Sequence, residues 1–258
     1  MDSLNPILSR METITLDQMS GVKLMNRVDE KFLMNRQQLA ALLDLVVDEY
    51  YVQRIDGDAL APYNTLYFDT EDVAMYTEHH NRRLNRQKLR IRTYLSSGTT
   101  FMEVKNKNNK GKTKKVRIKV DKSIFYHALD DAQVREFLSE QSRYPLDLLM
   151  PHVENTFRRI TLVDKAKTSR ITIDSEIRFV NHHTGINYDL SPLVIMEVKH
   201  EVGAPLSAIQ RAMLEVRVHP KRMSKYCIGT VLTNPQAKYN RFKQKIRYIN
   251  DTISSSHT

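Results

Sequence analysis

Tryptophan is absent from this 258-residue sequence, and cysteine occurs once, as Cys227. A single cysteine excludes an internal disulfide and suits a reducing compartment. Because it lies in the apolar stretch SKYCIGTVL, we expect a small buried side chain rather than a nucleophile. The lack of tryptophan, with tyrosines mostly inside apolar tracts, argues against a platform for stacking the bases of single-stranded nucleic acids. We therefore expect no nucleic-acid partner.

Long apolar runs and flexible linkers are also missing. The longest apolar stretch, LAALLDLVV, has nine residues and contains Asp44, whereas about 20 are needed to span a bilayer. The N-terminus has no apolar run of signal length. The chain has only 7 glycines and 8 prolines, and they do not cluster into a linker that would divide it. We therefore expect one domain over residues 1–258, with a disordered tail at about 252–258. We predict a soluble, cytoplasmic protein. Peripheral contact with a membrane through the basic segment KYNRFKQKIRY stays open.

Positive charge, by contrast, is abundant. The formal net charge is +10, which points to a polyanionic partner such as a phosphate compound, a nucleic acid or an anionic membrane surface. Lysine crowds residues 101–120, FMEVKNKNNKGKTKKVRIKV, where apolar residues recur at strand-like intervals. The charge therefore belongs to a folded hairpin rather than to a floppy tail.

Alternation of apolar and polar residues predicts about eight strands. They cover residues 23–34, 63–70, 88–95, 100–107, 114–120, 155–163, 169–179 and 192–201. Helical patterns cover residues 36–50, 71–83, 131–143, 204–217 and 234–250. Joins of hairpin length, such as SSGT at 96–99, favour antiparallel pairing, so we expect an α+β fold.

Alternate side chains of a strand point to opposite faces of a sheet, and here one face of most strands is charged. That face is mostly Arg and Lys with a few carboxylates. It includes Arg90, Arg92, Lys115, Arg117, Arg159, Arg170, Asp174, Glu176, Arg178, Glu197 and Lys199. One charged face can simply be solvated, but so many like charges would repel one another across an open sheet. A closed antiparallel barrel of eight strands with flanking helices would gather them inside a tunnel for a phosphate chain and a divalent metal.

The motifs RVDEKF, YFDT, LRIRTY, EVKNK…GKTKKVRI, FRRITL, RITIDSEI, IMEVKHE and KRMSKY occur in this order between Arg27 and Ile228. Together they resemble the polyphosphate polymerase domain of the vacuolar transporter chaperone (VTC) complex, which belongs to the triphosphate tunnel metalloenzymes. The resemblance implies an eight-stranded antiparallel tunnel that binds ATP and Mn²⁺ or Mg²⁺. It also implies that the enzyme transfers the terminal phosphoryl group of ATP to a growing inorganic polyphosphate chain.

Carried over by motif, the catalytic phosphate ligands would be Lys31, Arg90, Arg92, Lys105, Lys115, Arg159 and Arg170. Residues that bind phosphate or product would be Arg117, Lys199, Arg222 and Lys225. Glu197 would be the metal ligand, although a structural salt bridge to Lys199 or to an arginine opposite is the alternative. Asp174 and Glu176 could complete the metal shell or balance the arginines.

The sequence departs from the hydrolytic members of this superfamily at its first strand. Those members begin with Glu-x-Glu-x-Lys, whereas this chain has Arg27, Asp29 and Lys31 in the corresponding places. Loss of the first glutamate disfavours simple hydrolysis, and the excess of cations over carboxylates favours a polymerase, whose anionic acceptor needs no general base. The alternatives are a triphosphatase of the same fold and a non-catalytic module that binds polyphosphate or another polyanion. We find no membrane segment, so transport of a product would need a separate membrane protein.

Overall fold

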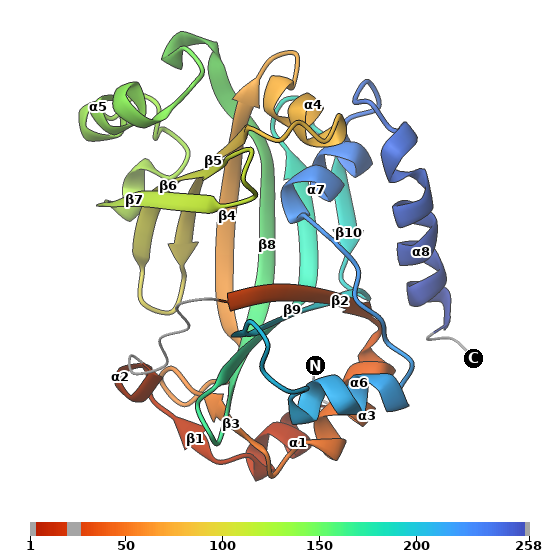
Figure 1. Cartoon of the computed structure of the whole chain (residues 1–258). Coiled ribbons are helices and arrows are strands. Elements are labelled where there is room, and N and C mark those ends of the chain that lie inside the picture. Colours follow the sequence, from red (N-terminus) through yellow and green to blue (C-terminus); the bar gives the residue numbers. More distant parts are fainter. Residues whose placement is uncertain (1–3, 20–26, 256–258) are drawn as a thin grey trace.

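The structure is a computed structural model that describes residues 4–19 and 27–255. Its framework is an 11-stranded sheet (Figure 1). Eight strands follow one another in a continuous antiparallel order. They are β2 (Arg27–Met34), β11 (Val194–Glu201), β9 (Ser169–Asn181), β8 (Leu149–Asp164), β4 (Ala61–Thr70), β5 (Arg86–Tyr94), β6 (Thr99–Lys107) and β7 (Thr113–Val120). Three short strands extend this order: β1 (Thr13–Ile14), β3 (Tyr50–Gln53) and β10 (Asn187–Leu190). The predicted α+β class and antiparallel pairing are confirmed.

The predicted closure into a barrel is wrong for the residues that the structure describes. β2 and β7 are the two ends of the strand order, and no pairing joins them there. β7 carries Lys114, Lys115, Arg117 and Lys119 along its length, and lysines on an edge strand disfavour the docking of another strand. The sheet is nevertheless strongly bent, and β2 crosses in front of β8 and β9 (Figure 1). It therefore has a concave face rather than a closed cylinder.

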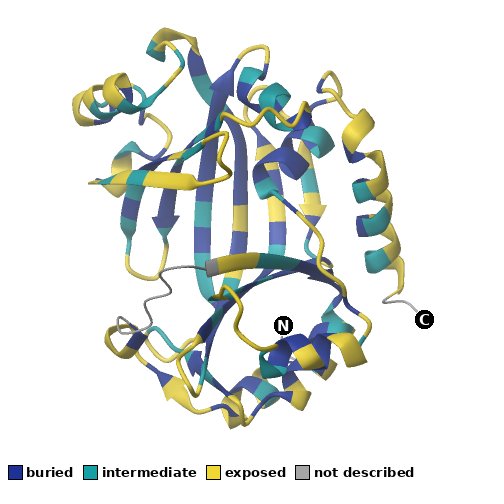
Figure 2. Cartoon of the chain, in the orientation of Figure 1, coloured by how far each residue is buried: buried dark blue, intermediate teal, exposed yellow. Residues whose placement is uncertain are grey.

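Apolar side chains fill two large cores on the sheet. One core joins β2, β8, β9 and β11 to the helices α1 (Asn5–Arg10), α3 (Arg36–Leu45) and α6 (Ala208–Glu215). The other joins β4, β5 and β6 to α4 (Ala74–His80), α5 (Ala132–Gln141), α7 (Lys225–Thr233) and α8 (Lys243–Ser254). A helix of four residues, α2 (Leu16–Met19), follows β1 along the chain. Figure 2 shows the long strands mostly buried, with a few exposed positions along them, while much of α8 is exposed.

A bulge in β9 changes which side chains share a face. The register between β8 and β9 shifts at Thr156/Arg158, and Glu176 has a positive φ of 52°. An extra residue in one strand moves the following side chains to the opposite face. Arg178, predicted to share a face with Asp174, instead lies near Asp189 of β10, with 3.7 Å between Nε and Oδ2.

The helices differ from the sequence prediction in several places. The first helix ends at Leu45 rather than at residue 50, because Tyr50 begins a strand that pairs with β8. The helices α1, α2 and α7 were not predicted. Helix α7 buries Cys227, as expected for a small apolar side chain. The last helix continues to Ser254, into the segment expected to be a disordered tail. Among the described residues, no helix has both the length and the apolar character needed to cross a membrane.

Candidate functional site

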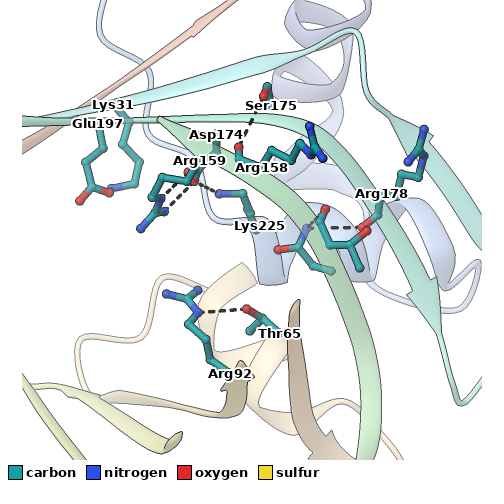
Figure 3. Close-up of polar contacts among 12 residues, drawn as sticks. Lys31, Thr65, Arg92, Arg158, Arg159, Asp174, Ser175, Arg178, Glu197 and Lys225 are labelled. Atoms are coloured by element: carbon teal, nitrogen blue, oxygen red, sulfur yellow. Dashed lines mark hydrogen bonds and ion pairs between the residues drawn. The ribbon is translucent and has the colours of Figure 1, made fainter. Parts of the chain in front are cut away.

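Three carboxylates on the concave face are each held by two cations from different elements, and we call this region the concave site. The first carboxylate is Asp174 on β9. It receives Nε and Nη2 of Arg159 on β8 at 2.6 and 2.8 Å, and it also pairs with Lys225 at the start of α7 (Figure 3). The two-pronged guanidinium of Arg159 and the ammonium of Lys225 thus both contact the buried carboxylate of Asp174.

The second carboxylate is Glu197 on β11. It pairs with Lys31 on the neighbouring strand β2 and with Lys199 two residues along its own strand. Lys31 lies directly opposite Glu197 in the register of β2 and β11. The salt bridge to Lys199 that the sequence left as the alternative to metal binding is therefore present, and Lys31 adds a second cation.

The third carboxylate is Glu103 on β6, whose side chain is 1% exposed. Its Oε2 accepts Nε of Arg90 at 2.7 Å, and its Oε1 accepts Nζ of Lys115 at 2.9 Å. The partners come from β5 and β7, the two strands that flank β6. Sequence analysis placed both cations in the site but gave no role to Glu103, although it lies on the charged face of its strand.

The cations keep all three carboxylates ionised. Burial by itself raises the pKa of Glu103, but Arg90, Arg92 and Lys115 outweigh it and lower the pKa to about 2. The same balance holds the pKa of Asp174 and of Glu197 well below the usual range, through their paired cations. A carboxylate with such a low pKa is a poor proton acceptor at neutral pH.

Arg92 differs from these paired cations. It is 9% exposed, and its Nε donates to Oγ1 of Thr65 on β4 at 3.0 Å. In the part of the chain that the structure describes, no carboxylate lies within ion-pair distance of Arg92. Burial, followed by the charge of Arg90, lowers the pKa of Arg92 to about 10, so it remains charged at neutral pH. Arg92 and Arg159 extend from β5 and β8 toward the same space (Figure 3).

Two aromatic rings lie beneath these cations. Tyr63 on β4 and Phe157 on β8 stack with centroids 5.1 Å apart. The guanidinium of Arg159 lies 5.0 Å from the Tyr63 centroid, and Nζ of Lys225 lies 4.2 Å from the Phe157 centroid. Such rings attract the cations and restrict their positions without neutralising them. Sequence analysis missed this pair, although Tyr63 precedes the YFDT motif with the spacing of the concave face.

Lysines occupy the other wall of the concave site. Desolvation, together with the charges of Lys88 and Arg90, lowers the pKa of Lys105 to about 8, and Lys31 and Glu197 on the facing strands also affect it. Lys88, not predicted as a site residue, donates its Nζ to Oγ of Ser224 at 2.9 Å. It lies two residues before Arg90, so the alternation of side chains could have identified it.

Three further predicted ligands have other surroundings: Arg117 and Arg170 lie on strands of the concave site, Arg117 opposite Glu103 in the register, and Arg222 lies before α7. Arg117 on β7 stacks on Phe101, with its guanidinium 4.1 Å from the ring centroid. Arg170 is partly buried on β9, opposite Lys199 in the register. Arg222 is exposed before α7, close enough to Lys107 to lower the pKa of that lysine. The remaining predicted residues converge on the concave site.

The carboxylates of the concave site do not form a metal cage of protein ligands alone. Within residues 4–19 and 27–255, no group of three or more His, Cys, Asp or Glu side chains is placed to hold a metal ion. Mg²⁺, however, is commonly held by one or two carboxylates together with substrate phosphates and water. Glu197, whose two lysine partners lie beside it as ligands for phosphate oxygens, has the donor chemistry of such a shared site.

Comparison with known proteins gives a family and two similar folds. The family model of the VTC domain matches residues 26–234. No curated protein matches the sequence. A protein from Bacillus halodurans, described as a candidate adenylate cyclase, is similar in structure, with a TM-score of 0.50 and 14% identity over 84% of this chain and 97% of that chain. A Hippeastrum protein, described as a candidate adenylyl cyclase with a dominant triphosphatase activity, has a TM-score of 0.50 and 14% identity over 81% of this chain and 97% of that chain.

Proposed function

The chain belongs to the VTC domain family, and on this premise we propose that it is a polyphosphate polymerase dependent on Mn²⁺ or Mg²⁺. It would transfer the terminal phosphoryl group of ATP to the end of an inorganic polyphosphate chain, releasing ADP. The concave site would take the place of the expected tunnel. A terminal phosphate oxygen of the acceptor chain would form a bond to the γ-phosphorus of ATP. The bond between that phosphorus and the oxygen that bridges it to the β-phosphate would break, and ADP would leave with this oxygen.

The observation that supports this reaction most strongly is the state of the carboxylates. Glu103, Asp174 and Glu197 are each engaged by two cations, and those cations lower the pKa of all three. None is poised to deprotonate a water molecule. An acceptor phosphate is already an anion and needs no general base, so positioning and charge neutralisation suffice.

Each predicted residue has a role in this proposal. Arg90, Arg92 and Arg159 would bind the oxygens of the transferred phosphoryl group and of the adjacent phosphates, because the planar guanidinium can donate two parallel hydrogen bonds to phosphate oxygens. Lys31, Lys105, Lys115, Lys199 and Lys225 would add point charges, while Arg117, Arg170 and Arg222 would bind the chain further out. Glu197 would hold the divalent ion, whose contribution is to neutralise phosphate charge. Its lysine partners would then turn to the substrate.

Triphosphate hydrolysis is the second candidate, since a structurally similar protein is described as a triphosphatase. Polymerisation and hydrolysis can be distinguished by their products. We expect purified protein incubated with ATP and Mn²⁺ to yield ADP and an acid-labile polymer that forms a ladder on a gel. Release of inorganic phosphate without polymer would instead indicate a hydrolase. If ATP stays intact while polyphosphate binds, the chain is a binding module.

A further inference from the structure

A second basic surface lies outside the concave site, where the C-terminal helix α8 begins beside the loop that follows α4. A cavity of about 440 Å³ is present there. It is lined by Arg82, Asn240, Arg241, Lys243 and Gln244. Cavities of about 300–1,000 Å³ are the usual size of small-molecule sites. The lining offers three cations and two amides, and no acid.

The charges of this cavity are not neutralised by the protein. Within the described part of the chain, Arg82, Arg241 and Lys243 form no ion pair with a carboxylate. The concave site differs, because there most cations share a carboxylate. Converging cations without carboxylates repel one another and favour the binding of an anion that offers several acceptor oxygens.

The cavity is held in place by packing on α4. Phe242 is buried, and its ring stacks on Tyr76 with centroids 5.9 Å apart. The backbone N–H of Arg241 donates to Nε2 of His80 at 3.4 Å, and the hydroxyl of Tyr76 donates to the carbonyl of Lys238. The segment that carries Arg241 and Lys243 is therefore anchored to the element that leads into Arg82.

A strip of cations connects this cavity to the concave site. Lys107 lies on β6, two residues after Lys105, and its pKa is lowered by burial and by Arg86 and Arg222. Arg222 and Arg82 also oppose the charge of Lys245 on α8, whose pKa is lowered chiefly by burial. The contacts of α8 agree with this proximity. Nζ of Lys245 lies 5.3 Å from the ring centroid of Phe242, which stands between Arg241 and Lys243, and Nζ of Lys221, next to Arg222, lies 4.6 Å from the ring centroid of Tyr248 on α8. Lys107, Arg222, Lys245 and Arg82 therefore lie between the rim of the concave site and the cavity. We call these four residues the basic strip.

We propose that the cavity binds a segment of the inorganic polyphosphate chain that leaves the concave site along the basic strip. This inference rests on the proposed function and extends it to a second, chain-length-dependent site. A tripolyphosphate in the concave site would be too short to occupy both, whereas a long chain could contact them together. Retention of the chain at two points would slow its release, as expected for linked binding sites.

The test compares the affinity of full-length protein variants for tripolyphosphate and for a long polyphosphate at one salt concentration. We expect Arg82→Ala/Arg241→Ala to weaken binding of the long chain by about tenfold or more, since losing even one of the two charge-assisted contacts costs about tenfold. Tripolyphosphate binding should stay within about twofold of wild type. Lys122→Ala/Arg135→Ala removes two exposed cations elsewhere and should leave both affinities unchanged. The single variant Arg241→Gln serves if the double variant does not fold.

The outcomes distinguish this inference from the proposed function. If tripolyphosphate binding is normal and both double variants bind the long chain as wild type does, the second site is refuted while the concave site stands. If wild type binds neither ligand, both proposals fail. Loss of binding to vesicles containing anionic lipid, with polyphosphate binding unchanged, would show that the cavity contacts a membrane and would also refute the inference.

Discussion

At the scale of single residues, the site combines two kinds of cation. Arg159, Lys31 and Lys115 are held by carboxylates, which fix their positions before any substrate arrives. Arg92 is buried without such a partner and is positioned by Thr65 instead. A buried cation that the protein does not neutralise gains most from an incoming phosphate. Arg92 is therefore the residue on which activity should depend most.

We predict that Arg92→Ala lowers the rate of polyphosphate synthesis by about 10²–10³, the usual cost of losing one charge-stabilising donor. Arg92→Lys should recover only part of the rate, because the lysine ammonium is a point charge and lacks the planar guanidinium fork that can bind a phosphate while its Nε donates to Thr65. Lys110→Ala, on the exposed turn between β6 and β7, is the control and should leave the rate unchanged. Equal loss in all three variants would indicate diffuse binding of polyanions.

A second residue-scale prediction concerns pH. The pKa of Lys105 is lowered to about 8, so this lysine loses its charge as pH rises through that value. If it binds phosphate, affinity for tripolyphosphate should be greatest below pH 8 and should fall between about pH 8 and pH 9. Lys105→Arg keeps the charge and should remove this fall, which calorimetric titration over that range would measure. A fall of the same size in the arginine variant would assign the effect to another group.

At the scale of secondary-structure elements, α7 is the element missed by sequence patterns that matters most for the site, because it carries Lys225. Its residues KYCIGTVLT include a glycine and several β-branched side chains, which are weak helix formers. The helix forms because it packs on β8 and β9, where Gly229 allows close approach. A Cβ at Gly229 would lie 2.6 Å from Cδ1 of Phe179 and 2.7 Å from Cγ1 of Val153. The helix in turn carries Lys225 to Asp174.

The substitution Gly229→Ala tests this packing, because the two effects of the added methyl group on stability have opposite signs. In an isolated helix the substitution would stabilise the helix by about 1 kcal/mol. Here we expect destabilisation by about 1–3 kcal/mol, since the methyl group overpacks the contact with Phe179 and Val153. Urea unfolding would measure the free energy of unfolding. An increase in stability would show that α7 is not held by close packing on the sheet.

At the scale of the whole molecule, the strand order is open, and its two end strands both contribute to the concave site. Lys31 lies on β2 and Lys115 on β7. A phosphate chain that contacts both would join the two ends of the sheet through the ligand rather than through backbone hydrogen bonds. Binding should therefore stabilise the whole fold and not only the side chains at the site.

We predict that tripolyphosphate raises the free energy of unfolding by about 2.7 kcal/mol at a concentration of 100 times its Kd. For a chain of this size, each kcal/mol raises Tm by roughly 2–4 °C. Amide hydrogen exchange should slow in β2 and β7 as well as in the central strands. Sodium chloride at matched ionic strength is the control. Protection confined to central strands would mean that the ligand does not join the ends.

The sequence by itself determined the eight strands of the continuous order and most cations of the site, because both follow from the alternation of side chains along each strand. Residues 63–70, 88–95, 100–107 and 114–120 match β4, β5, β6 and β7 closely, and the charges of Arg90, Arg92, Lys105 and Lys115 lie on the predicted face. Only the tertiary structure decided which groups pair across strands, since pairing depends on register, on the bulge at Glu176 and on the bend of the sheet. The open strand order, the aromatic pair beneath Arg159 and the placement of Lys225 by α7 follow from long-range packing, for which local sequence has no signal.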